Sequence, residues 1–119
     1  MTPEEVVRAE LGAWEKLDVD AIISCFAPEA VWENVASGAV RSGHAAIREV
    51  TEGYMAHTKS FRAEILNIAT SGNVVLTERI DHVDYDGRVV DLRIMGAFEV
   101  AEGKVRAWRD YFDMGGLSG

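Results

Sequence analysis

The sequence predicts an α+β fold in which N-terminal helices pack on one face of a mainly antiparallel sheet. Up to about residue 57, apolar residues recur every three to four positions, which is the period of an amphipathic helix. From Ser60 onward they alternate with a period of two, as in half-buried strands. Three turn signals, Ser71-Gly72, Asp86-Gly87 and Glu102-Gly103, divide this second part into four runs. Helices followed by hairpin-connected strands are typical of the α+β class.

The first helix has a clear start signal. Thr2 is a suitable N-cap, Pro3 fits the first turn, and Glu5 completes a capping box. The apolar residues that follow, among them Val6 and Leu11, keep helical spacing. The sequence therefore predicts a helix that begins directly after Thr2.

Shorter elements follow before the strand-rich part of the chain. A second helix is expected over Val19–Phe26, with Pro28 ending it, and a brief strand over Ala30–Asn34. A loop is expected from Ser37 to Gly43, and a third helix from His44 to about His57.

Four strands are expected in the second part: Phe61–Thr70, Asn73–Tyr85, Arg88–Val100 and Lys104–Asp113. The second of these runs is apolar on both faces of the strand. One face can pack against the helices, and the other predicts contact with a second subunit. We therefore expect a homo-oligomer, most simply a homodimer.

Composition narrows the class of protein. The 119 residues suit a single domain, residues 1–119, and the net charge of −8 argues against a nucleic-acid or anionic-membrane partner. No apolar stretch approaches the ~20 residues of a membrane span, and the N-terminus lacks signal-peptide features. Cys25 is the only cysteine, and no His/Cys cluster has metal-ligand spacing. We expect a cytoplasmic protein without a metal or other cofactor.

Charged residues occur where core residues are expected. Arg79 and Asp81 share one face of a predicted strand, and Asp110 shares a face with Trp108 and Phe112 in another. A carboxylate between two aromatic residues must be paired, hydrogen-bonded or protonated. Two carboxylates with an arginine between them can hold opposite protonation states, so that one acts as acid and the other as base. A purely structural ion-pair network remains the alternative.

Two segments carry a resemblance to a known family. Thr77-Glu78-Arg79-Ile80-Asp81, followed by Trp108-Arg109-Asp110-Tyr111-Phe112-Asp113, resembles limonene epoxide hydrolase. That family belongs to the NTF2-like, SnoaL-like superfamily, whose cone-shaped, cystatin-like fold packs helices on a curved, mainly antiparallel mixed sheet. The resemblance implies direct addition of water to a small hydrophobic epoxide, giving a vicinal diol. Arg79 would bridge the two carboxylates, Asp81 would act as general acid and Asp110 as general base.

The resemblance also implies how the attacking water is held. In the family an Asn and a Tyr on the first strand help to position it; Asn34 matches the Asn, whereas Trp32 occupies the Tyr position. An indole can donate one hydrogen bond but cannot accept one, so water positioning differs here. The tail Met114–Gly119 is also shorter than in the family, which predicts a more open pocket mouth.

The rest of the pocket wall is expected to be apolar, as in most small-ligand sites. Candidate wall residues lie on the strand and helix faces that point inward. They are Trp32, Val83, Leu92, Ile94, Phe112, Leu11, Trp14 and Tyr54.

Two other functions stay open at this stage. A ketosteroid-isomerase-like or polyketide-cyclase-like enzyme would use the same fold with a single proton-shuttling carboxylate. A non-catalytic small-ligand-binding protein would use the pocket alone. Trp32 favours either alternative, whereas an arginine between two carboxylates favours hydrolysis. A purely structural interpretation is also open for two of the site residues: Asn34 would cap the end of a strand, and Trp32 would be a core residue.

Overall fold

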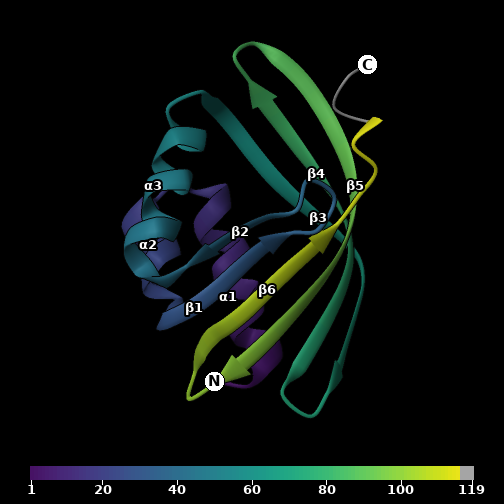
Figure 1. Cartoon of the computed structure of the whole chain (residues 1–119). Coiled ribbons are helices and arrows are strands. Elements are labelled where there is room, and N and C mark those ends of the chain that lie inside the picture. The colour runs from purple at the N-terminus through teal and green to yellow at the C-terminus, as the bar shows by residue number, and fades with distance from the viewer. Residues whose placement is uncertain (116–119) are drawn as a thin grey trace.

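Three helices cover the concave side of a strongly curved six-stranded sheet in the computed structural model of the chain, which describes residues 1–115 (Figure 1). The elements follow one another along the chain as α1 Pro3–Glu15, α2 Val19–Ser24, β1 Phe26–Asn34, β2 Ala39–Ser42, α3 Gly43–Met55, β3 Thr58–Ser71, β4 Val74–Tyr85, β5 Arg88–Ala101 and β6 Lys104–Tyr111. The prediction that the short tail leaves the pocket mouth more open concerns mainly residues 116–119, which lie outside the described residues.

The sheet order is β2-β1-β6-β5-β4-β3. Strands β3 to β6 form the predicted meander of antiparallel hairpins. Strand β1 then pairs with β6 in parallel, which makes the sheet mixed. This parallel pairing places β1, the first strand of the chain, beside β6, the last strand.

The predicted helix starts are confirmed at α1 and α2. Thr2 Oγ1 accepts a hydrogen bond from Glu5 N at 3.2 Å, and Thr2 N donates to Glu5 Oε1 at 2.8 Å, which completes the capping box. Asp18 Oδ1 caps α2 by accepting a hydrogen bond from Ala21 N at 3.0 Å.

The predicted end of the second helix is wrong. Helix α2 stops at Ser24, and strand β1 begins at Phe26 and runs through Pro28. The start of this strand is fixed by its pairing with β6, because Val105 N of β6 donates a hydrogen bond to Cys25 O at 2.8 Å. The pairing shifts register between Phe26 and Val31, and this irregularity accommodates the proline, which has no backbone N–H.

The loop predicted between Ser37 and Gly43 contains a strand. Strand β2 forms an antiparallel hairpin with β1, in which Asn34 pairs with Ala39. Gly38 turns the chain with φ of +78°, a conformation that favours glycine. The prediction missed β2 because the strand is short and mostly exposed, so it carries no alternating apolar signal.

The predicted strand faces are confirmed. In β4, Val75, Thr77, Arg79, Asp81 and Val83 are buried, and the intervening side chains point outward. The concave face divides into two parts: under α1 and α2 it is a closed aliphatic and aromatic core, and toward the other end it opens into a cavity. None of the helices within residues 1–115 is both long and apolar enough to cross a bilayer.

Glu10 is the exception within the closed core. Its side chain is fully buried, and among residues 1–115 the only hydrogen-bonding neighbour of its carboxyl group is the weakly polar thiol of Cys25. Burial raises the pKa of Glu10 well above its usual range, because the charged form would lose its hydration. We therefore describe Glu10 as a neutral carboxylic acid in the folded protein.

This assignment predicts a pH-dependent stability. Glutamate in the unfolded chain ionises near pH ~4.3, whereas buried Glu10 stays protonated to higher pH. Its contribution to stability is thus full below about pH 4.3 and is lost as pH rises toward the native pKa, with a slope of about 1.4 kcal/mol per pH unit. Glu10→Gln removes the ionisation, so the Tm of this variant relative to wild type should increase between about pH 5 and pH 8.

Thermal unfolding followed by circular dichroism measures this difference. Glu49→Gln, at an exposed position of α3, is the control, and an equal pH trend in both variants would contradict the assignment.

Candidate active site

One row of residues crosses four strands at the inner end of the cavity. Thr77 of β4 lies opposite Gly96 of β5, Gly96 opposite Asp110 of β6, and Asp110 opposite Asn34 of β1. The Arg79 side chain reaches this row from β4. A Cβ atom at Gly96 would lie only 2.5 Å from Arg79 Nη1, 2.8 Å from Asp110 Oδ1 and 2.9 Å from Thr77 Oγ1. The missing side chain of Gly96 therefore makes room for the guanidinium group.

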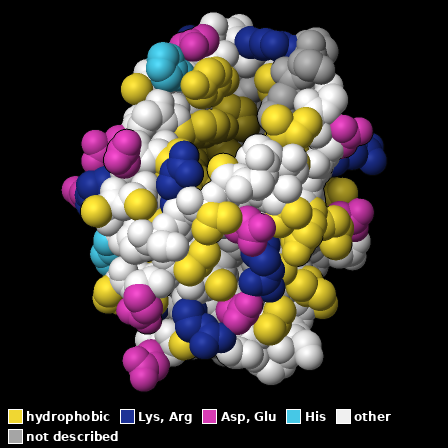
Figure 2. Space-filling view, in the orientation of Figure 1, with side chains coloured by type: hydrophobic (Ala, Val, Ile, Leu, Met, Phe, Trp, Pro, Cys, Tyr) yellow, Lys and Arg dark blue, Asp and Glu magenta, His cyan; other side chains and the backbone are white. Residues whose placement is uncertain are grey.

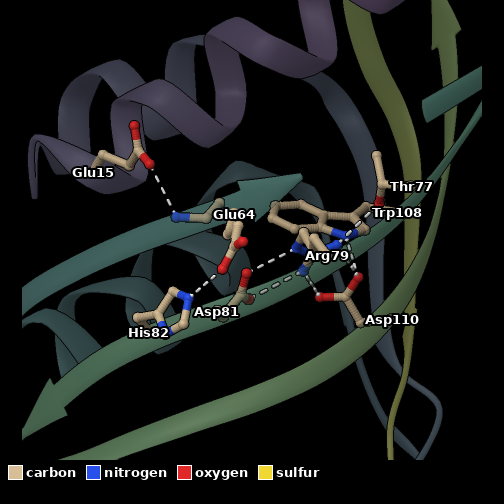
Figure 3. Close-up of polar contacts among 9 residues, drawn as sticks. Glu15, Glu64, Thr77, Arg79, Asp81, His82, Trp108 and Asp110 are labelled. Carbon is tan, nitrogen blue, oxygen red and sulfur yellow. Dashed lines mark hydrogen bonds and ion pairs between the residues drawn. The ribbon is translucent and has the colours of Figure 1, made fainter. Parts of the chain in front are cut away.

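Arg79 bridges the two aspartates (Figure 3). Its Nε donates to Asp81 Oδ1 at 2.9 Å, and Nη2 contacts Asp81 Oδ2 at 3.3 Å. On the other side, Nη1 donates to Asp110 Oδ1 at 3.1 Å and Nη2 to Asp110 Oδ2 at 2.7 Å. Nη1 also donates to Thr77 Oγ1 at 3.2 Å. Every N–H-bearing atom of the guanidinium thus has a partner, as burial of a charge requires.

Asp110 receives a further donor from its own strand. The indole Nε1 of Trp108 donates to Asp110 Oδ1 at 2.7 Å. Oδ1 therefore accepts two hydrogen bonds, whereas Oδ2 accepts one, from Arg79. Since each carboxylate oxygen has two acceptor positions, Oδ2 is the atom with a position left for a ligand.

The three charged side chains are buried, with Arg79 at 1%, Asp81 at 6% and Asp110 at 8% exposure. Burial raises the pKa of Asp81, and the nearby positive charge of Arg79 opposes this rise only in part. Burial alone would lower the pKa of Arg79, but the two carboxylates more than offset this, so its pKa is raised. The arrangement therefore combines a permanently charged arginine with two buried carboxyl groups, of which Asp81 has its pKa raised by burial.

A cavity of about 580 Å³ opens in front of these groups. Figure 2 shows it as a hollow with hydrophobic side chains inside. Aromatic rings form much of the wall: the Trp14 ring lies 5.6 Å from Trp32 and 5.7 Å from Tyr54, and Trp32 stacks on Trp108 at 5.4 Å. Burial and the charge of Asp81 raise the pKa of Tyr54 to about 12, so the phenol is neutral. The cavity thus has a polar inner end and an apolar wall.

The structure brings most of the predicted site residues together around this cavity. Those that line it are Trp14, Trp32, Asn34, Tyr54, Arg79, Asp81, Val83, Leu92, Asp110 and Phe112.

Two of the predicted wall residues do not line the cavity. Leu11 is buried in the core beneath α1, and Ile94, opposite Arg79 in the β4–β5 pair, is 5% exposed. Leu11 belongs to the buried side of α1, and Ile94 lies on the concave face of β5. The curvature of the sheet assigns part of that face to the closed core, and strand alternation cannot indicate where this division falls.

Sequence reasoning also missed several lining residues. They are Ala39, Arg41, Val50, Phe61, Tyr85, Arg88, Val90 and Trp108. The first two lie on strand β2, which was not predicted. Trp108 belongs to the buried core and also lines the cavity, and its position two residues before Asp110 on the same strand face was the signal that its N–H could reach that carboxylate. Residues 1–115 contain no cluster of three or more His, Cys, Asp or Glu side chains arranged to hold a metal ion.

Comparison with known proteins agrees with this geometry. Residues 1–118 match the family described as "Limonene-1,2-epoxide hydrolase catalytic domain". Epoxide hydrolase EphG of Mycobacterium tuberculosis H37Rv is 33% identical over 110 residues, which cover 91% of this chain and 71% of EphG. The solved structure of an LEH-like epoxide hydrolase from M. tuberculosis has a TM-score of 0.85 at 29% identity and covers 96% of this chain and 84% of that one.

More distant structures share the fold alone. A putative SnoaL-like polyketide cyclase from Shewanella denitrificans OS-217 has a TM-score of 0.86 at 12% identity, covering 98% of this chain and 93% of that one. The comparisons confirm the NTF2-like, SnoaL-like fold and the family resemblance predicted from the sequence.

The close contacts at Gly96 lead to a prediction for stability. In Gly96→Ala the added methyl group must displace Arg79, Asp110 or Thr77, so we expect a loss of about 1–3 kcal/mol in the free energy of unfolding. Gly53→Ala is the matched control, because Gly53 lies within α3 and a Cβ atom there would meet nothing within 4 Å. This control should gain about 0.5–1 kcal/mol. Urea unfolding of both variants measures the difference, and a Gly96→Ala variant as stable as wild type would rule out the tight fit.

Proposed function

The chain belongs to the limonene-1,2-epoxide hydrolase family, and from this premise we propose that it adds water directly to a small hydrophobic epoxide, giving a vicinal diol. The observation that carries the proposal is the buried guanidinium of Arg79 between two carboxylates at the inner end of an apolar cavity. An acid and a base on opposite sides of the substrate allow one-step hydrolysis without a covalent intermediate.

In the proposed reaction Asp110 is the general base. A water bound at Asp110 Oδ2 gives its proton to that oxygen as the water oxygen forms a bond to an epoxide carbon. Asn34 holds the same water: its Oδ1 accepts one hydrogen bond, from Ser37 N at 3.3 Å, which leaves a second acceptor position on Oδ1 for the other proton of the water. Trp108 and Arg79 fix the Asp110 carboxylate in position.

Asp81 is the general acid. As the carbon–oxygen bond of the epoxide breaks, the carboxyl proton of Asp81 passes to the departing oxygen, so that no free alkoxide forms. Burial raises the pKa of Asp81, which makes this carboxyl group a better holder of the proton than an exposed aspartate. Oδ2 is the oxygen of Asp81 that carries it, because the contact of Oδ2 with Arg79 is the longer of the two. After the reaction, a proton is lost from Asp110 and regained by Asp81 through solvent.

Amide substitutions test these roles. Asp110→Asn and Asp81→Asn each remove one proton-transfer step, worth about 10²–10⁴-fold in rate, so turnover should fall at least that far while the circular dichroism spectrum is unchanged. Asp113→Asn, at an exposed carboxylate outside the cavity lining, is the control and should keep wild-type activity.

Diol formation from limonene oxide, cyclohexene oxide and styrene oxide gives the rates. A single turnover in heavy-oxygen water should place label from solvent in the diol. Ordinary turnover by either folded variant would refute the assignment.

One observation favours a second function. Trp32 stands where the family has a tyrosine that helps to hold the water, and it lines the cavity with Trp14 and Trp108. This aromatic wall suits a protein that binds a small apolar ligand without converting it. In that case the folded wild-type chain would bind the same epoxides, detected by tryptophan fluorescence, and release no diol.

We also propose that the chain acts as a homodimer through its outer sheet face. Four large apolar side chains of that face are between 45% and 51% exposed: Leu66, Leu76, Met95 and Tyr111. Met95 and Tyr111 lie directly opposite each other on β5 and β6, which makes part of this apolar surface continuous. A second copy of the chain would cover it.

The dimer is tested by light scattering after size-exclusion chromatography. Wild type should have twice the 13.1 kDa mass of the chain, and Met95→Glu should shift it toward the monomer. Val89→Glu is the control, since Val89 is 71% exposed on the β4–β5 hairpin and outside the four-residue patch. A monomeric wild type at about 0.1 mM would contradict the proposal, because a stable dimer has a Kd near or below the micromolar range.

A further inference from the structure

The charges that line the cavity differ in sign from the charge of the whole protein. The chain has a net charge of −8, yet the charged residues lining the cavity are three arginines and two aspartates. Arg79 is paired with both aspartates. The remaining two arginines, Arg41 and Arg88, therefore give the lining an excess of positive charge.

Both arginines are exposed at the cavity rim and come from different strands. Arg41 lies on β2 directly opposite Trp32, which lines the cavity wall. Arg88 is the first residue of β5 and lies opposite Tyr85, another lining residue. Figure 2 shows basic side chains at the margin of the hydrophobic hollow. The rim thus presents cations at the open end of the cavity.

Neither side chain is within 4.0 Å of a carboxylate among residues 1–115. Arg41 Nη1 donates only to the carbonyl oxygen of Val40, at 3.2 Å. By contrast, Arg8, Arg48, Arg106 and Arg109 each pair with a surface carboxylate. The two arginines that could receive an anion from a bound ligand are thus among those that are not neutralised by the protein surface.

We propose that the cavity selects epoxides that carry a carboxylate group at the end remote from the epoxide ring. This inference rests on the proposed function and names its substrate class. The ring would lie at Asp81 and Asp110, the apolar body would fill the aromatic wall, and the carboxylate would meet Arg41 and Arg88 at the rim. The planar guanidinium fork matches the geometry of a carboxylate.

The position of the arginines determines which kinetic constant they affect. Because they lie at the exposed rim and not at the reacting atoms, they stabilise the bound substrate and the transition state alike, so their effect appears in KM. Solvent and salt screen the rim, so the preference weakens as ionic strength rises.

A charge series on one carbon chain tests the proposal. The substrates are the terminal epoxide of undecylenic acid, the primary alcohol of the same chain length, and its trimethylammonium analogue. An exposed ion pair contributes up to about five-fold each, so kcat/KM for the acid should exceed that for the alcohol by about ten-fold or more at low salt, mainly through KM. The cationic analogue should be the poorest substrate.

Charge-neutral variants locate the effect. In Arg41→Gln/Arg88→Gln the ratio of kcat/KM for acid over alcohol should fall to about one, with each single variant in between. Arg8→Gln makes the same charge change on α1, outside the cavity lining, and should keep the wild-type ratio. A ratio near one in wild type, a preference for the cation, or an unchanged ratio in the double variant would overturn the inference.

A binding measurement separates this inference from the proposed reaction. If no substrate of the series yields diol, the hydrolase proposal fails, and rim selectivity is decided by tryptophan fluorescence with octanoate and octanol. Tighter binding of octanoate that is lost in Arg41→Gln/Arg88→Gln supports selection of a carboxylate. Equal binding of the two probes rejects it.

Discussion

Burial of the Arg79 guanidinium is the constraint on which the rest of the site depends. A cation with 1% exposure is stable only where every donor is matched, and here two carboxylates and one hydroxyl from two strands supply the acceptors. The strands must also leave space for it, which they do at Gly96, the register partner of both Thr77 and Asp110. Removing one partner of such a group leaves an uncompensated buried charge, so the arrangement is maintained as a unit.

The two aspartates hold Arg79 in unequal ways, and the proposed mechanism gives each of them a different role. Asp110 accepts from Arg79 and also from the Trp108 indole, which matches a carboxylate that has acceptors only. Asp81 has Arg79 as its donor, and burial raises the pKa of its carboxyl group. The proposed assignment of acid and base therefore rests on these hydrogen-bond partners as well as on position.

Much of this site was predictable from local patterns, because a period of two fixes which side chains share a strand face. On that basis Arg79 and Asp81 were assigned to one face of a strand and Asp110 to a core-type face of another, and the structure buries all three. Features that depend on pairing between distant strands were not predictable. The start of β1 at Phe26 is set by its pairing with Val105, far along the chain. Strand β2 is the edge strand of the sheet and pairs with β1 alone. The position of Ile94 was misjudged because sheet curvature, which no local pattern encodes, decides which part of the concave face borders the cavity, and that of Leu11 because helical spacing shows only that it is buried.

Trp32 determines how the proposed water can be held. The Trp32 ring stacks on Trp108, and the Trp108 N–H donates a hydrogen bond to Asp110. Trp32 therefore contacts the residue that orients the proposed base. Any hydrogen bond that Trp32 makes to a water is one that it donates, because an indole has no acceptor. The water must then give one proton to Asp110 Oδ2 and its other proton to a different acceptor. Its remaining lone pair must face the epoxide carbon. Asn34 Oδ1 lies on the neighbouring strand and accepts one hydrogen bond, from Ser37 N, so a carbonyl acceptor position is left there. Replacement of the family tyrosine by tryptophan is therefore consistent with hydrolysis if Asn34 takes over the acceptor role of the tyrosine hydroxyl.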